Sequence, residues 1–142
     1  MTQLAFHFNA PSKVAYACKL LRKATSTGAR VAVLAPTAML GRLDQELWTF
    51  SPLDFVAHVC APCSPQAMAH SPVLLCDDAA QAQGCSVLVN LSDALPADVA
   101  RFERVIEVVT ADATDRSGAR ERWKQYVAQG YDITRHDLQL AS

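Results

Sequence analysis

Glycine is scarce in this 142-residue sequence, which holds five glycines that stand apart from one another. A P-loop or a dinucleotide-binding turn needs several closely spaced glycines, because the backbone must approach the phosphates without side chains in the way. The turns expected after the first two strands instead have the sequences Asn-Ala-Pro-Ser and Pro-Thr-Ala-Met. We therefore expect no nucleotide-binding loop and no cofactor.

Catalytic, membrane and secretion signatures are missing as well. No Gly-x-Ser-x-Gly segment is present, which excludes a nucleophile elbow of that type, and the four histidines form no convincing catalytic set with the cysteines. No apolar run approaches the roughly 18 residues that a membrane span requires. The first residues lack the basic and apolar regions of a secretory signal. We expect a cytoplasmic protein of one domain, residues 1–142, with reduced cysteines and no membrane partner.

An excess of charge of one sign is also missing, since 13 Lys and Arg against 14 Asp and Glu give a formal net charge of −1. This balance argues against bulk, charge-driven binding to nucleic acid. The charges are nevertheless segregated: residues 1–42 hold six basic side chains and no acid, and residues 43–100 hold seven acids and no Lys or Arg. The pattern fits either interleaved solvated faces or two interaction faces of different character.

What the sequence does contain is an alternation of strand-like and helix-like segments. Ser12 and Gly28 are placed to begin and end the first helix, and Gly130 is placed to end the last one. The alternation predicts an α/β protein with a mostly parallel sheet and helices on both faces. The expected strands span 4–8, 29–35, 55–60, 73–76, 85–91 and 105–109, and the later helices are expected over 38–50, 95–102 and 115–129.

One short cysteine motif is typical of metal or redox sites. Cys60-Ala-Pro-Cys63 is a CxxC pair, and His58 and His70 flank it. The spacing fits no standard zinc finger, and a redox pair should lie at a helix N-terminus rather than in a proline-bounded loop. We expect no metal site, and a zinc- or thiol-based protein built on Cys60 and Cys63 is the alternative to the hypothesis developed below.

The helix expected over 115–129 carries the most distinctive group of side chains. Arg116, Arg120 and Lys124 recur at i, i+4 and i+8, so they lie along one flank, and Trp123 lies within one turn of two of them. A guanidinium can clamp a carboxylate while an indole ring covers an apolar group, a combination that suits a peptide C-terminus. The alternative is an ordinary amphipathic helix in which Trp123 packs inward and the cations are solvated.

Segments from one end of the chain to the other resemble a known family. They are Phe6-His-Phe, Gly28-Ala-Arg-Val-Ala-Val-Leu, Leu43-Asp-Gln-Glu-Leu-Trp48 with Asp54-Phe-Val-Ala-His58, and Ala119-Arg-Glu-Arg-Trp-Lys-Gln-Tyr126 ahead of Gly130-Tyr-Asp. In these segments the sequence is similar to the chi subunit of the bacterial DNA polymerase III holoenzyme. The resemblance implies a Rossmann-like, three-layer α/β fold without a nucleotide. It also implies a non-enzymatic, replisome-associated adaptor that meets DNA only indirectly.

The resemblance assigns residues to a first partner, the single-stranded-DNA-binding protein, whose acidic C-terminal tail ends in Pro-Phe. It implies that Arg120 grips the terminal carboxylate of the tail and that Trp123 walls the pocket for the terminal Phe. Arg116 and Lys124 are implied to face the acidic residues of the tail, and Val109 to form the floor of the pocket.

The resemblance assigns a second surface to the psi subunit, through which chi is joined to the clamp-loader complex. Trp48 and Phe55 match that surface, and Ala57 stands where some members of the family have Pro. A helicase or a repair factor is an alternative occupant of the same face. Aromatic anchors suit a protein interface, whereas the alternative for Trp48 is packing in the core.

Overall fold

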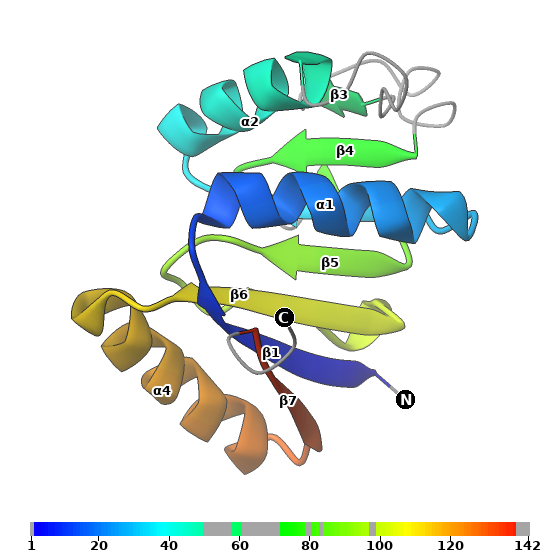
Figure 1. Cartoon of the computed structure of the whole chain (residues 1–142). Helices are drawn as coiled ribbons and strands as arrows, with labels where there is room; N and C mark the ends of the chain where they lie inside the picture. The colour runs from blue at the N-terminus through cyan, green and yellow to red at the C-terminus, as the bar shows by residue number, and fades with distance from the viewer. Residues whose placement is uncertain are drawn as a thin grey trace.

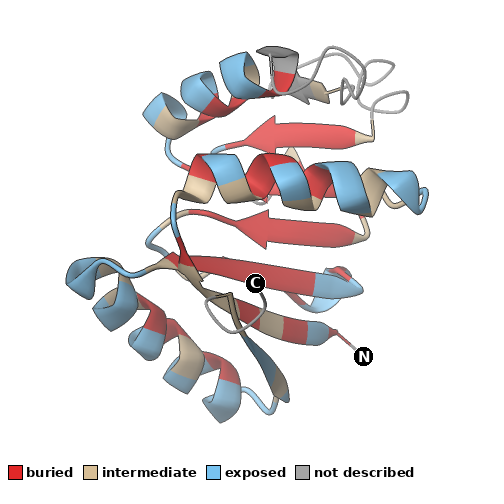
Figure 2. Ribbon diagram, viewed as in Figure 1, coloured by how far each residue is buried: buried red, intermediate tan, exposed pale blue. Residues whose placement is uncertain are grey.

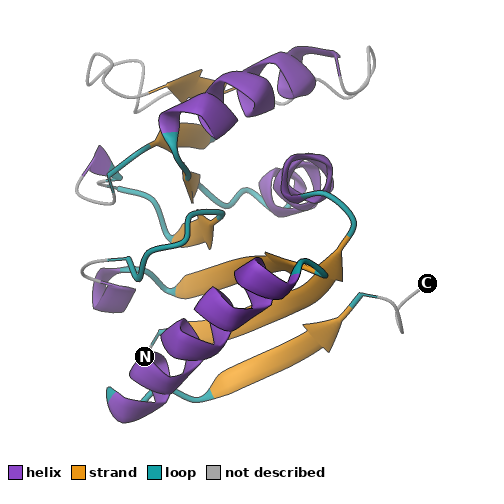
Figure 3. Ribbon diagram, turned by 90° about the vertical axis from the view of Figure 1, so that its left-hand side faces the viewer, coloured by secondary structure: helices purple, strands orange, loops and turns teal. Residues whose placement is uncertain are grey.

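The computed structural model describes residues 2–49, 58–60, 72–78, 81–82, 84–96 and 99–138. Within this part of the chain the strands form one seven-stranded sheet in the order β3-β4-β2-β5-β6-β1-β7, and every pairing is parallel (Figure 1). Helices lie on both faces of the sheet, as the view turned by 90° shows (Figure 3). The predicted three-layer α/β fold with a mostly parallel sheet is confirmed.

The described elements alternate along the chain much as the sequence predicts. In order they are β1 (Gln3–Ala10), α1 (Lys13–Ser26), β2 (Val31–Leu34), α2 (Thr37–Thr49), β3 (His58–Cys60), β4 (Val73–Cys76), β5 (Val87–Asn90), the short 3-10 helix η2 (Val99–Arg101), β6 (Arg104–Thr110), α4 (Ala113–Ala128) and β7 (Ile133–Asp137).

The central strands bury their side chains on both faces of the sheet. In β2, Val31 and Val33 belong to the apolar cluster under α1 and α2, whereas Ala32 and Leu34 belong to the cluster on the opposite face, with residues of α4 and η2. Every residue of β2, β4 and β5 is buried (Figure 2). Burial on both faces explains why these strands are uninterrupted apolar runs in the sequence.

The predicted helix boundaries around α1 and after α4 are confirmed. The hydroxyl of Ser12 accepts a hydrogen bond from the backbone N–H of Ala15 at 3.3 Å and so caps α1. Gly28 and Gly130 follow the two helices with φ angles of +85° and +91°. These are left-handed conformations that glycine adopts without steric cost, which is why the helices end there.

The expectation of a helix over 95–102 is wrong in the part of that segment that the structure describes, where only η2 is helical. The chain after β5 instead turns around the side chain of Asn90. Its amide nitrogen donates to the carbonyl oxygen of Ala94 at 3.1 Å, and its amide oxygen accepts from the N–H of Ser92 at 3.0 Å. A side chain that bonds the local backbone in this way competes with a helix.

The last helix and the strand after it also differ from the expectation. Helix α4 begins at Ala113 rather than at Asp115, because the carboxylate of Asp112 accepts from the backbone N–H groups of Thr114 and Asp115, both at 3.1 Å. Strand β7 was not predicted. It is an edge strand with exposed side chains in its middle, so it lacks the apolar signal of the central strands.

Candidate functional site

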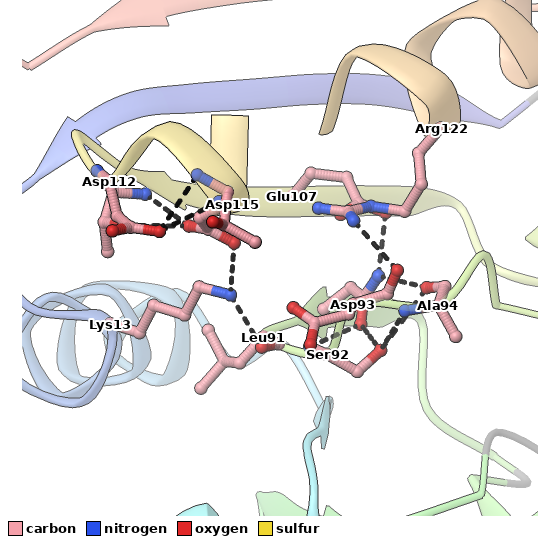
Figure 4. A network of polar contacts seen from close by, with 12 residues as sticks. Lys13, Leu91, Ser92, Asp93, Ala94, Glu107, Asp112, Asp115 and Arg122 are labelled. Atoms are coloured by element: carbon pink, nitrogen blue, oxygen red, sulfur yellow. Dashed lines mark hydrogen bonds and ion pairs between the residues drawn. The ribbon is translucent and has the colours of Figure 1, made fainter. Parts of the chain in front are cut away.

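A buried polar network fixes helix α4 against strand β6 (Figure 4). The carboxylate of Glu107, which is fully buried, accepts from Nε of Arg122 at 3.0 Å, from Nδ2 of Asn90 at 2.9 Å and from the hydroxyl of Tyr126 at 2.8 Å. Burial raises the pKa of Glu107, and the Arg122 charge together with the three donated hydrogen bonds opposes that rise. Three donors and no acceptor face the carboxylate, so the ionised form fits the site.

The hydrogen bonds of Arg122 and Tyr126 to Glu107 fix which side of α4 faces the sheet and which side faces outward. Ala119, Arg122 and Tyr126 recur at helical spacing and are buried against the sheet. The exposed cations Arg116 and Arg120 lie on the flank beside this buried face. Arg122 lies in the segment that resembles the chi family, but no pattern in that segment predicts a buried cation. Glu107, which lies in the middle of an apolar strand, is the ion-pair partner of Arg122, and a charged residue in such a strand indicates a buried partner of opposite charge.

A second polar cluster holds the beginning of α4. Nζ of Lys13 lies 2.9 Å from Oδ1 of Asp115 and donates to the carbonyl oxygen of Leu91 at 3.0 Å (Figure 4). The other carboxylate oxygen of Asp115 accepts from the backbone N–H of Thr110 at 2.7 Å. Burial acts to raise the pKa of Asp115, but the hydrogen bonds from Thr110 and Lys13 and the Lys13 charge outweigh it and lower that pKa below its usual value. The helix is thus anchored to α1 and to the end of β6.

The outward flank of α4 borders a cavity of about 350 Å³ that also touches β1 and β7. Four of the residues singled out from the sequence lie together around it: Arg116, Arg120, Trp123 and Lys124. The sequence did not point to the remaining lining residues, which are Phe8, Asn9, Ala119 and Arg135. We call this cavity the α4 pocket.

Aromatic rings form the apolar side of the α4 pocket. The Trp123 ring is half-buried, and its centroid lies 5.1 Å from that of Phe6 and 6.2 Å from that of Phe8. Val109, which the resemblance assigns to the pocket floor, is fully buried in the same apolar cluster and is not among the described residues that line the cavity. The indole is therefore neither sealed in the core nor free in solvent, and one part of it faces the cavity.

Cations form the polar side of the α4 pocket. Arg116 and Arg120 are exposed, and neither makes an ion pair with a carboxylate of the described residues. Lys124 lies 3.5 Å from Glu121, but both side chains are about 70% exposed (73% and 67%), so this pair holds the lysine only weakly. The guanidinium of Arg135 lies over the Phe8 ring at 5.1 Å, where it faces α4 from the sheet edge.

This arrangement suits a ligand that has an anionic and an apolar part. Four cations line this cavity, and none of the described residues that line it is acidic. Guanidinium groups bind carboxylates with two parallel hydrogen bonds, and an indole face provides contact area for a ring or an alkyl group. The alternative of an ordinary amphipathic helix describes the buried face of α4 but leaves the cation-lined cavity unexplained.

The other residues singled out from the sequence lie at or beyond the edge of the described structure. Trp48 belongs to the last turn of α2, but its side chain is not among the described ones, and Phe55 and Ala57 lie outside the described residues. Cys60 lies in β3 with its side chain likewise undescribed, and Cys63 lies outside. Among the described residues no three His, Cys, Asp or Glu side chains are placed to hold a metal ion. None of the described helices is long and apolar enough to cross a membrane.

Comparison with known proteins connects this structure to bacterial replication. Residues 1–134 match the family model described as "DNA polymerase III chi subunit, HolC". The sequence is 31% identical to the DNA polymerase III subunit chi of Pseudomonas aeruginosa over 128 residues, which cover 89% of this chain and 87% of that protein. The fold is similar to that of the C-terminal domain of the DEAD-box protein Dbp5, with a TM-score of 0.63 and 14% identity over 98% of this chain and 91% of the other.

Proposed function

Because this chain belongs to the family of DNA polymerase III chi subunits, we propose that it is a non-catalytic replication adaptor whose α4 pocket binds the acidic, Phe-terminated tail of single-stranded-DNA-binding protein. The observation that carries the proposal is the α4 pocket itself, a cavity of about 350 Å³ with an aromatic wall and four lining cations, and with no acid among the described residues around it. An acidic peptide with a free C-terminus and a terminal aromatic ring has the complementary chemistry.

In the proposed complex the terminal carboxylate lies against Arg120, the cation next to Trp123 in the middle of α4. The terminal Phe ring packs on the partly exposed indole of Trp123, which contacts the Phe6 and Phe8 rings. The Asp residues of the tail lie nearer Arg116 and Lys124, whose exposed side chains suit solvated ion pairs. The resemblance assigns Val109 to the floor of the pocket, and its fully buried side chain belongs to the apolar cluster against which Trp123 packs.

The same proposal gives the protein a second partner, the psi subunit, which contacts Trp48 of α2 together with Phe55 and Ala57. In Figure 1, α2 lies at the opposite side of the molecule from α4, so a partner on the α2 side leaves the α4 pocket free. An adaptor needs this separation, because it must hold the tail and the clamp loader at once. DNA then meets the protein only through its partners, in accord with the net charge of −1.

Calorimetry with a synthetic acidic peptide ending in Pro-Phe tests the tail-binding proposal. We expect Arg120→Ala to weaken binding at least tenfold, since a hydrogen bond to a charged group contributes about 1.5 to 3 kcal/mol. Arg42→Ala is the matched control, because Arg42 is also an exposed helical arginine but lies in α2. That control should bind like the unaltered protein.

Peptide variants separate the two halves of the recognition. A C-terminal amide removes the carboxylate and should abolish the difference between the unaltered protein and Arg120→Ala. Replacing the terminal Phe by Ala should remove the apolar contribution and leave the salt dependence. Equal affinities of the unaltered protein and Arg120→Ala for the free-acid peptide would contradict the proposal.

A further inference from the structure

The sheet has a second open region, on the face opposite to α4. There Ala5 and His7 of β1 and Thr134 and His136 of β7 point to the α1 side, because they alternate with residues that face α4. Thr134 and His136 are exposed, and His7 is half-buried. Figure 2 shows that β7 is largely exposed, whereas the central strands beside α1 are buried.

A cavity of about 260 Å³ lies between this open region and the C-terminal half of α1. An adjoining cavity of about 420 Å³ shares three of its lining residues, Ala5, Arg104 and His136. We call the two together the α1 groove. The smaller cavity has an apolar lining drawn from five elements or their flanks: Ala5, Leu20, Ala24, Ala29, Val87 and Ile106.

Basic groups surround the apolar lining of the α1 groove. Lys23 of α1, Arg104 of β6, His7 of β1 and His136 of β7 line the smaller cavity, and none of its lining residues is acidic. Asp132 lines the adjoining cavity. Neither Lys23 nor Arg104 forms an ion pair with a carboxylate of the described residues. Two cations on separate elements are thus available beside one hollow.

The end of α1 does not cancel this positive character. A helix C-terminus presents unpaired carbonyl groups that repel anions. Here three consecutive hydroxyls bond back to those carbonyls: Thr25 to Leu21 at 2.8 Å, Ser26 to Lys23 at 2.6 Å and Thr27 to Ala24 at 2.6 Å. The carbonyl groups nearest the α1 groove are therefore occupied within the helix.

The pKa of His7, which lines the α1 groove, is affected by the charges around the groove. The pKa of His7 is lowered to about 4, chiefly by burial and then, in this order, by the charges of His136, Arg104 and Lys23. Its ring makes a hydrogen bond through Nδ1 to the hydroxyl of Tyr16 and lies 4.7 Å from the His136 ring, centroid to centroid. At neutral pH the His7 ring is therefore uncharged, and the cations Arg104 and Lys23 act on it from two other elements, β6 and α1.

We propose that the α1 groove is a binding site for a small organic anion, a phosphate or carboxylate group carried on an apolar body. The anionic group lies between Lys23 and Arg104, with His136 at the open side. The apolar body lies on Leu20, Ala24 and Ile106. The adjoining cavity provides room for a larger body, since ligand sites in proteins commonly have volumes of about 300 to 1,000 Å³. This site is independent of the α4 pocket and lies on the other face of the sheet.

Histidine ring resonances in NMR spectra of the full chain provide the test, with phenyl phosphate and benzoate as probes. We expect saturable shifts of the His7 and His136 signals with at least one probe, and the two arms identify the preferred anionic group. Bound anion offsets the neighbouring positive charges, so the pKa of His7 should rise from about 4 when the probe is present. A rise in this pKa is a result that non-specific surface binding of the probe would not produce.

Variants locate the bound anion. Arg104→Gln and Lys23→Ala should each weaken probe binding by about tenfold, the effect of losing one hydrogen bond to a charged group. Lys19→Ala is the matched control, because Lys19 is exposed one turn earlier on α1 and does not line the α1 groove. A thermal unfolding curve for each variant checks that it is folded. The proposal is overturned if neither probe gives saturable shifts at tens of millimolar, or if both cavity variants bind like Lys19→Ala.

Discussion

Replacing Arg122 by Ala should destabilise the protein far more than replacing an exposed cation of the same helix. Arg122 is 3% exposed, and its Nε and Nη1 atoms bind Glu107 and the carbonyl oxygen of Asp93 at 3.0 and 3.1 Å. Removing one member of a buried ion pair leaves the other charge uncompensated, which typically costs about 3 to 5 kcal/mol. Asn90 and Tyr126 still donate to Glu107, so we expect the lower end of this range.

Lys124→Ala is the matched control. Lys124 lies on the same helix as Arg122 and also pairs with a glutamate, but its pair lies at the surface. Its partner Glu121 is 3.5 Å away, and both side chains are well exposed. Exposed pairs of this kind contribute less than about 1 kcal/mol. Urea unfolding, followed by the fluorescence of the two tryptophans, measures both variants. The double variant Glu107→Gln with Arg122→Met should recover part of the loss, because neither side chain then leaves a buried charge.

The comparison of the two variants decides whether the interior network holds α4 in place. A free energy of unfolding that falls by about 3 kcal/mol or more for Arg122→Ala, and by less than about 1 kcal/mol for Lys124→Ala, supports the reasoning. If the two variants lose the same stability, the Glu107 network does not fix the helix, and the orientation of the α4 pocket needs another explanation.

Two further predictions concern the beginning of α4 and the far wall of the α4 pocket. Because the pKa of Asp115 is lowered in the folded protein, its contribution is present above the unfolded pKa of about 3.9 and is lost as the pH falls through the folded value. The stability difference between the unaltered protein and Asp115→Asn, measured by urea unfolding, should therefore shrink as the pH falls below 4; a difference that is constant with pH would contradict this. Arg135→Ala should weaken tail-peptide binding by about 0.5 to 1 kcal/mol and flatten its salt dependence in calorimetry, and an unchanged salt dependence would show that Arg135 does not face the tail.

The sequence predicted most of the fold because its central strands are buried on both faces. A short run such as Val31–Leu34, all of it buried, has only one simple interpretation in an α/β chain. Strand β7 escaped prediction for the opposite reason. It lies at the edge of the sheet, and its central side chains are exposed, so no apolar periodicity marks it.

Only the part of the α4 pocket that lies on helix α4 could be predicted from the sequence. Arg116, Arg120, Trp123 and Lys124 are spaced along a helix, so their proximity follows from helical geometry. Phe8 and Arg135 line the same cavity from strands more than a hundred residues apart in the sequence, and only the pairing of β1 with β7 brings them to it. The segments that carry the family resemblance end at Asp132, so they did not point to Arg135.

NMR chemical shift perturbation by the acidic, Phe-terminated peptide tests whether the tail binds in the α4 pocket. We expect the largest shifts on the residues of the α4 pocket, including the indole Nε1–H of Trp123 and the backbone of β7. The His7 ring signal of the α1 groove should stay unchanged. If the peptide binds with its largest shifts on α1 or α2 and none at Trp123, the tail does not bind in the α4 pocket.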